Sequence, residues 1–180
     1  VKHPPRTTGV GRIMPADEHF HAGERALQQR WGSAPLWDAE RRQRLLWDHI
    51  PHALHARIAA APFFFLATSD AAGRCDCSFK GGGPGLVRIL DARSFAFPDF
   101  DGNGAFMSLG NLQQNPQVGC LFVDFADGAR LRVNGRATLL EGEAAAQLFP
   151  GRQRAVRVDV EEVVPNCAQH VPALVAPSAD

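Results

Sequence analysis

The change of sequence pattern at Pro62 constrains the fold most. From there to Leu140, short runs rich in β-branched and aromatic residues alternate with turn residues, which is typical of antiparallel strands joined by tight turns. Asp127-Gly128 is among the strongest hairpin signals in the chain. The expected strands span residues 63–68, 74–80, 86–90, 94–98, 118–125, 129–140 and 155–164. The sequence predicts a mainly β fold with peripheral helices, a small barrel of six to seven antiparallel strands.

The first third of the chain has a helical pattern instead. Apolar residues recur at helical spacing, and the expected helices span 17–32, 37–50 and 51–61, with shorter ones at 106–115 and 141–149. Residues 1–16 contain several prolines and glycines without periodicity, which indicates an extended arm. We therefore expect an N-terminal arm with helices packing on the barrel (1–61), the barrel (62–171) and a C-terminal tail (172–180).

The charge balance limits the partners. Lys plus Arg equals Asp plus Glu at 19 each, so no overall field favours a nucleic acid or an anionic membrane. The apolar runs are far shorter than the roughly 20 residues of a membrane-spanning helix, and the first residues do not resemble a signal peptide. We expect a cytoplasmic protein with a small-molecule ligand, no nucleic acid and no membrane.

The cysteines and histidines could form a metal site, but other interpretations fit them better. Cys75, Cys77, Cys120 and Cys167 are too few for a disulfide scaffold, and the one-residue gap between the first two is poor geometry for zinc with Cys167 and His170. We expect buried, reduced thiols and no metal. His49, His52 and His55 have helical spacing and could bind a metal or haem, although exposed helix histidines are more common.

Two polar clusters could hold a phosphate. Ser78 and Lys80 lie two apart on a strand, so both side chains point the same way, just before the glycine-rich loop 81–85. Asn103, Ser108 and Asn111 surround the start of the short helix, whose amides attract anions. The alternatives are a solvent-exposed strand end before a glycine turn and ordinary backbone capping.

Arg130 and Arg132 lie on one face of a long predicted strand, and Arg136 continues the row. A cation there could stabilise the charge that a flavin gains on reduction, or the row could be an exposed charged face. The sequence has no serine-hydrolase elbow or His-Glu-x-x-His motif, and the catalytic residues are unknown.

The motifs together resemble a family. Gly73 to Arg88 and Phe97 to Gly104 resemble a bacterial subgroup of the pyridoxamine 5′-phosphate oxidase-like flavoproteins. Ser108-Leu109-Gly110-Asn111-Leu112, Asn115-Pro116, Arg130 to Gly135, Phe149-Pro150-Gly151 and Val164 to Cys167 follow in the order of that family. The likeness covers about residues 62–171.

The resemblance implies an FMN-binding split barrel that forms a homodimer, with flavin sites at the subunit interface. By this likeness Ser78 and Lys80 face the phosphate, with Asn103, Ser108 and Asn111 nearby. Phe97 and Pro98 lie along the isoalloxazine ring, and Arg130 or Arg132 contacts its pyrimidine edge. Two departures stand out: Gly104, Ala105 and Met107 replace expected basic residues, and the tail lacks the substrate-binding residues of the true oxidases.

The leading hypothesis is therefore an FMN-dependent oxidoreductase of unknown substrate. The alternative is a non-catalytic flavin- or haem-binding module on the same barrel, and deazaflavin or haem could replace FMN in the cleft.

Overall fold

The computed structural model describes residues 19–166 and 169–172. The chain divides into two compact units, Val1–Trp47 and Asp48–Asp180. The predicted arm and the prediction for Cys167 lie outside the described residues, as does most of the predicted tail.

The first unit consists of short helices. They are α2 (Ala22–Arg30), the 3-10 turn η1 (Ala34–Leu36) and α3 (Ala39–Leu45). The His21 side chain caps α2 by accepting from the amides of Gly23 and Glu24, and the Glu24 carboxylate accepts from the His21 amide in return. Within the predicted helix 17–32, α2 therefore begins at a histidine cap.

The predicted helix 37–50 is wrong in its extent. α3 ends at Leu45, and Leu46 has extended backbone. Ile50 is fully buried, and its amide donates to the carbonyl of Ala92 at 2.7 Å, in the turn of a hairpin far along the chain. This long-range bond overrides the local helical pattern. The next helix, α4, begins after Pro51 as predicted.

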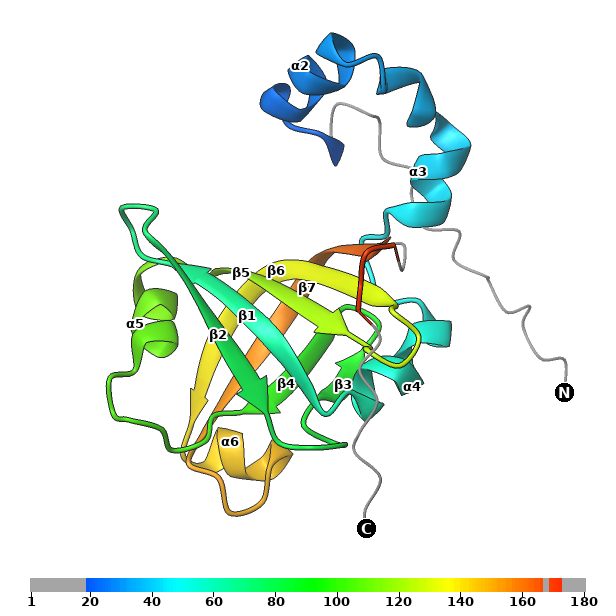
Figure 1. Ribbon diagram of the computed structural model, residues 1–180. Helices are drawn as coiled ribbons and strands as arrows, with labels where there is room; N and C mark the ends of the chain where they lie inside the picture. Colours follow the sequence, from blue (N-terminus) through cyan, green and yellow to red (C-terminus); the bar gives the residue numbers. More distant parts are fainter. Residues whose placement is uncertain (1–18, 167–168, 173–180) are drawn as a thin grey trace, which may run out of the picture. The chain divides into compact units, whose positions relative to one another are not determined.

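The second unit is a seven-stranded antiparallel sheet with the order β2-β1-β5-β6-β7-β4-β3. It curls into a barrel that stays open between the edge strands β2 and β3 (Figure 1). The predicted mainly β barrel of antiparallel strands with peripheral helices is confirmed. The elements are α4 (His52–Ala60), β1 (Phe63–Ser69), β2 (Cys75–Gly81), β3 (Arg88–Asp91), β4 (Ser94–Pro98), α5 (Met107–Gln114), β5 (Gln117–Val123), β6 (Arg130–Glu141), α6 (Glu143–Leu148) and β7 (Arg154–Asn166).

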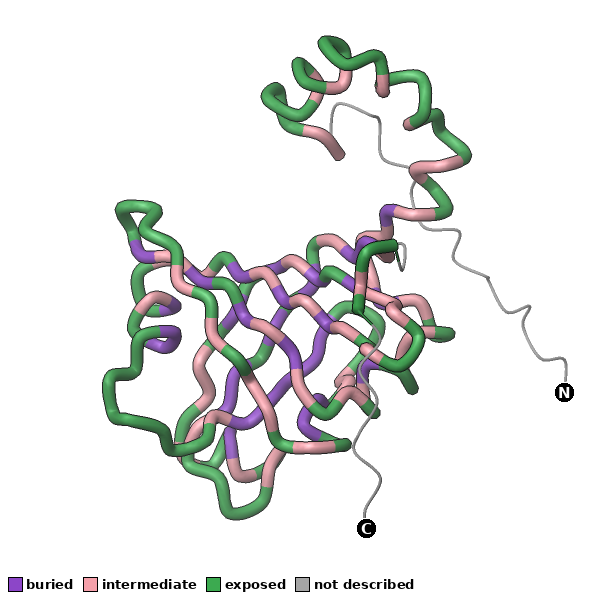
Figure 2. Tube along the Cα trace, in the orientation of Figure 1, coloured by how far each residue is buried: buried purple, intermediate pink, exposed green. Residues whose placement is uncertain are grey.

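The core lies inside the barrel and is built from alternate strand residues (Figure 2). Phe64 is central: its ring meets Phe97 edge-on at 5.0 Å and Phe122 at 5.1 Å between centroids. Phe95 and Val133 are also fully buried. This interior holds β1, β4, β5 and β6 together through side chains as well as backbone bonds.

Two turns follow the sequence prediction closely. Between β1 and β2, Asp70 accepts from the amides of Ala72 and Arg74 at 2.9 Å each. Between β5 and β6, Asp127 accepts from the Ala129 amide at 2.8 Å. These bonds fix the hairpin registers on which the position of any site on β2 depends.

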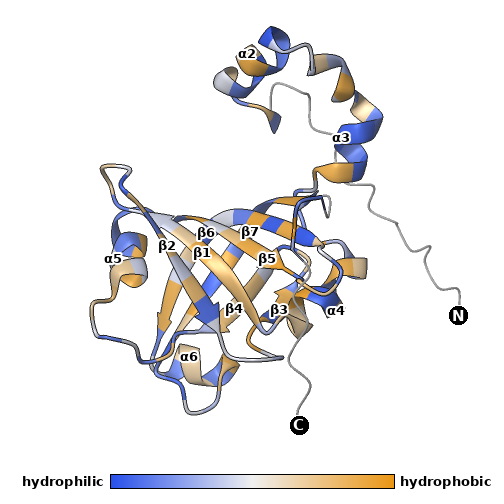
Figure 3. Ribbon diagram, viewed as in Figure 1, coloured by the Kyte–Doolittle hydropathy of each residue, from blue (hydrophilic) through white to orange (hydrophobic). Residues whose placement is uncertain are grey.

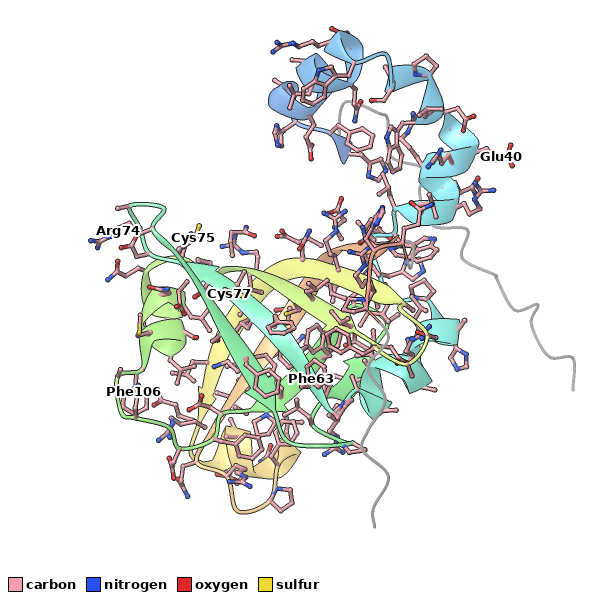
Figure 4. All side chains as sticks on the ribbon, viewed as in Figure 1. Glu40, Phe63, Arg74, Cys75, Cys77 and Phe106 are labelled. Atoms are coloured by element: carbon pink, nitrogen blue, oxygen red, sulfur yellow. The ribbon has the colours of Figure 1, made fainter. Side chains whose placement is uncertain are left out.

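The prediction of buried thiols is wrong for the two cysteines of β2. Cys120 is buried, as expected, but Cys75 and Cys77 are exposed on the outer side of the strand (Figure 4). The inner side of β2 carries polar residues instead. Within residues 19–166 and 169–172, no helix is long and apolar enough to cross a membrane.

Candidate functional site

A pocket of about 240 Å³ lies where the inner face of β2 meets the start of α5 and the loop that precedes it. Its lining comes from two segments that are far apart in the sequence, β2 and the stretch from Asp99 to Leu109. The lining residues are Asp76, Ser78, Lys80, Asp99, Phe100, Gly102, Asn103, Gly104, Phe106, Met107, Ser108 and Leu109.

The register of β2 aims three polar side chains into this pocket. Asp76, Ser78 and Lys80 pair with Thr68, Leu66 and Phe64 of β1. Paired residues of antiparallel strands project to the same face, and all three partners on β1 are buried. β2 lies at the edge of the sheet, and the side chains on its inner face border the pocket.

Arg154, at the start of β7, anchors the loop between β4 and α5. Its Nε atom lies 3.0 Å from Asp99 Oδ2, and its Nη2 atom lies 2.6 Å from Asp101 Oδ1. The guanidinium also lies 5.1 Å from the centre of the Phe106 ring. The hydrogen bonds that Arg154 donates to Asp99 and Asp101 raise the pKa of Arg154 above its usual value. The Asp99 carboxylate, which lines the pocket, is therefore already paired with the Arg154 guanidinium.

The start of α5 is open to a ligand. Phe106, at the N-cap position, has φ 50° and ψ 31°, a left-handed conformation that is uncommon for a bulky residue, and its ring is 52% exposed. No side chain of the described residues caps the helix. Met107, Ser108 and Leu109 line the pocket, so the first turn of α5 and the positive end of its dipole border it.

A chain of hydroxyl groups crosses the pocket. Ser78 Oγ and Ser108 Oγ are 2.9 Å apart, and Ser108 Oγ lies 3.4 Å from Asp76 Oδ2. Among the described residues, the Lys80 ammonium has no hydrogen-bond or ion-pair partner. The pocket therefore combines a cation that is available to a ligand, two hydroxyls and an uncapped helix end.

The structure brings four of the predicted residues together: Ser78, Lys80, Asn103 and Ser108 all line the pocket. Asn103 also accepts from the Ala105 amide at 3.0 Å, which is the capping role considered as its alternative. Asn111 lies one turn further along α5 and donates to Thr68 Oγ1 at 3.0 Å, outside the lining.

The residues predicted to lie along the flavin ring are elsewhere in the single chain. Phe97 is 1% exposed and packs in the core, and Pro98 pairs with Ala155 of β7. Arg132 donates to Asn166 Oδ1 at 3.1 Å, and Arg130 lines a separate cavity of about 470 Å³ beneath α4. Their contacts with a cofactor stay predictions.

Sequence reasoning missed Asp76, Asp99, Phe100 and Phe106 as pocket residues. Asp76 could have been found, because it is two residues before Ser78 on the same face of the strand. The others depend on the path of the loop, which no local pattern encodes.

No group of three or more metal-binding side chains comes together in the described part of the chain. The His49 ring contacts Asp48 Oδ1 at 2.9 Å, and the His55 ring contacts the Ile50 carbonyl at 3.0 Å. Neither ring lines the pocket at β2.

Comparison with known proteins identifies the family of this chain. The model of the pyridoxamine 5′-phosphate oxidase family matches residues 50–167. The chain therefore belongs to the pyridoxamine 5′-phosphate oxidase family. A search of curated protein sequences gives no match.

Solved structures of several bacterial proteins are similar to this chain. HupZ of Group A Streptococcus is 22% identical, with a TM-score of 0.51 over 70% of this chain and 100% of its own. A candidate pyridoxamine 5′-phosphate oxidase of Lactobacillus delbrueckii is 19% identical, with a TM-score of 0.52 over 65% of this chain and 94% of its own. An FMN-binding protein of Syntrophomonas wolfei is 12% identical, with a TM-score of 0.47 over 79% of this chain and 96% of its own. At these identities the first two comparisons establish the fold.

Proposed function

We propose that the protein is an FMN-binding flavoprotein and an FMN-dependent oxidoreductase acting on a small molecule. The observation that carries the proposal is the meeting of Lys80, Ser78 and Ser108 with the uncapped start of α5 in one pocket. Lys80 supplies charge, the hydroxyls supply hydrogen-bonding groups, and the helix amides supply donors aimed at an anion. Family membership over residues 50–167 supports the same cofactor class.

The size of the pocket supports phosphate rather than whole-cofactor binding. Sites that enclose a drug-sized ligand usually measure roughly 300 to 1,000 Å³, whereas this pocket measures about 240 Å³. The phosphate end of FMN would be held here by Lys80, Ser78 and the α5 amides. The ring would extend beyond this pocket and would need further walls.

A second copy of the chain is our proposed source of those walls. The outer face of β1 and β2 carries stacked rings: Phe63 lies 5.3 Å from Phe79 between centroids, and Phe79 is 61% exposed. β1 is mostly hydrophobic along its length (Figure 3). The neighbouring strands add Leu121 of β5, which pairs with Arg132 of β6. Two copies joined through this face would shield the rings and place the arginines of β6 at the shared boundary.

The dimer proposal has a direct test. Sedimentation analysis should show a dimer for the wild-type chain. Phe79→Glu places a charge on the outer face of β2 without filling the core, and it should give folded monomers. A wild-type protein that sediments as a monomer at every concentration would refute the proposed dimer.

Bound FMN would supply hydride or single-electron chemistry, and the residues of this chain would bind and orient it. The lining offers carboxylates but no histidine or cysteine, and Asp99 is held in an ion pair. This lining also favours a second candidate, a flavin-binding module without turnover. Reduction of bound flavin by NADH or NADPH, followed by reoxidation with product formation, supports the enzyme; the absence of both supports the module.

Replacing Lys80 with alanine tests the binding site itself. Loss of a charge-assisted contact costs about 1.5 to 3 kcal/mol, so the dissociation constant for FMN should rise about tenfold or more. Quenching of FMN fluorescence measures it. Arg44→Ala removes an exposed cation from α3 and should leave the constant unchanged. Equal FMN dissociation constants for Lys80→Ala and wild-type protein would show that Lys80 does not contribute to FMN binding.

A further inference from the structure

The pocket contains a carboxylate where a phosphate site would be expected to hold only positive and neutral groups. Asp76 lines the pocket together with Ser78 and Lys80 and lies on the same face of β2. Asp99 also lines it, but Arg154 pairs with that carboxylate at 3.0 Å. Among the described residues, Asp76 pairs with no cation. Its charge is therefore felt by whatever anion enters.

Hydrogen bonding shows what Asp76 does to the two hydroxyls. An ionised carboxylate only accepts, so the proton between Asp76 and Ser108 belongs to Ser108, at an oxygen separation of 3.4 Å. A hydroxyl has one proton, so the proton in the 2.9 Å contact between Ser78 and Ser108 comes from Ser78. Both serine protons are thus committed in the direction of Asp76. A phosphate, which also only accepts, has to compete with this carboxylate for them.

The charges lead to the same conclusion. Lys80 is the cation available to a ligand among the pocket's lining residues, and Asp76 offsets its charge. A phosphate oxygen bonded to Ser108 at roughly 2.7 Å would lie within about 6 Å of the Asp76 oxygen. Two like charges at this distance repel appreciably wherever water screens them incompletely. The repulsion grows with each charge on the phosphate.

We propose that Asp76 is a specificity-determining residue that weakens binding of a doubly charged phosphate, so that the flavin ring and not the phosphate supplies most of the affinity. The proposal rests on the flavin-binding function proposed above. It predicts that wild-type protein distinguishes poorly between FMN and riboflavin, which lacks the phosphate. FMN is still the bound flavin, but its phosphate adds little to the affinity.

Asp76→Asn tests this proposal, because the amide keeps the shape and the ability to accept from Ser108 but removes the charge. The ratio of the riboflavin and FMN dissociation constants, both measured by fluorescence quenching on the full chain, isolates the phosphate. This ratio should rise at least tenfold in Asp76→Asn, which corresponds to about 1.4 kcal/mol. The riboflavin constant itself should not change.

The controls separate charge from structure. Asp76→Glu keeps the charge and should keep a low ratio, and Asp76→Ser provides a second neutral variant should the asparagine fail to fold. Asp159→Asn makes the same charge change on β7, where Asp159 pairs with Arg157, and should leave both constants unchanged. If FMN binds but the ratio stays at its wild-type value in the neutral variants, the proposal for Asp76 is wrong and FMN binding stands. If neither flavin binds to any of these proteins, both proposals fall.

Discussion

Gly135 offers the sharpest test of the sheet, because a side chain on this residue of β6 would clash with the backbone of β7. A β-carbon built on Gly135 would lie 2.1 Å from the backbone oxygen of Asp159 and 3.1 Å from Cα of Val160. The register shifts at this point, between Asn134 and Gly135. β6 lies between β5 and β7 and is bonded to both, so neither backbone can move freely.

Gly135→Ala should therefore cost about 3 kcal/mol of unfolding free energy, the upper part of the range for overpacking. For a chain of this length that lowers the melting temperature by roughly 6 to 12 °C. Thermal unfolding followed by circular dichroism measures it. A melting temperature within about 1 °C of wild type would mean that the close approach and the register at the bulge are wrong.

Gly110→Ala is the matched control for this prediction. Gly110 lies inside α5, its φ is negative, and a β-carbon there would meet nothing within 4 Å. Alanine is favoured over glycine inside a helix, so the same chemical change should stabilise the protein by about 0.5 to 1 kcal/mol. The two substitutions are therefore expected to shift the melting temperature in opposite directions.

Two further predictions concern titratable groups. Burial raises the pKa of the Cys120 thiol to about 12. In Cys167→Ser protein that also carries Phe79→Glu and is therefore expected to be monomeric, a disulfide reagent at pH 8 should modify the exposed Cys75 and Cys77 in the folded state and Cys120 only after unfolding. Hydrogen bonds from the Arg74 amide and guanidinium and from the Ala72 amide hold the pKa of Asp70 below its usual value. A carboxyl whose folded pKa is depressed stabilises the fold above about pH 4 and loses that contribution below it, so Asp70→Asn should flatten the decline in stability on acidification.

Most strands could be predicted from sequence because local chemistry fixes them. Asp70 and Asp127 satisfy the backbone of their own turns, and that signal is contained within four residues. The extended path of the chain after α3 could not be predicted, because there the Ile50 amide bonds to the carbonyl of Ala92. A helical pattern in sequence does not reveal a hydrogen-bond partner more than forty residues away.

The site was predictable to the extent that strand alternation defines it. Ser78 and Lys80 follow from a spacing of two, and the same rule includes Asp76. Alternation does not say which face of a strand points inward. The apolar character of Cys75 and Cys77 predicts that they lie inside, and the structure shows them exposed. The position of Phe106 in the left-handed region, and of the loop before it, required the structure.

The inverted pattern of β2 connects the proposed ligand to the proposed dimer. An ordinary strand of a barrel turns apolar residues inward and polar ones outward, whereas β2 places Asp76, Ser78 and Lys80 on the inner side and leaves Phe79 exposed on the outer side. Polar groups on the inner side are stable there because they border a hydrated pocket instead of the core. An exposed ring stacked on Phe63 is explained if a second copy covers it. Each face of this one edge strand would then serve a different partner, a flavin phosphate inside and a second subunit outside.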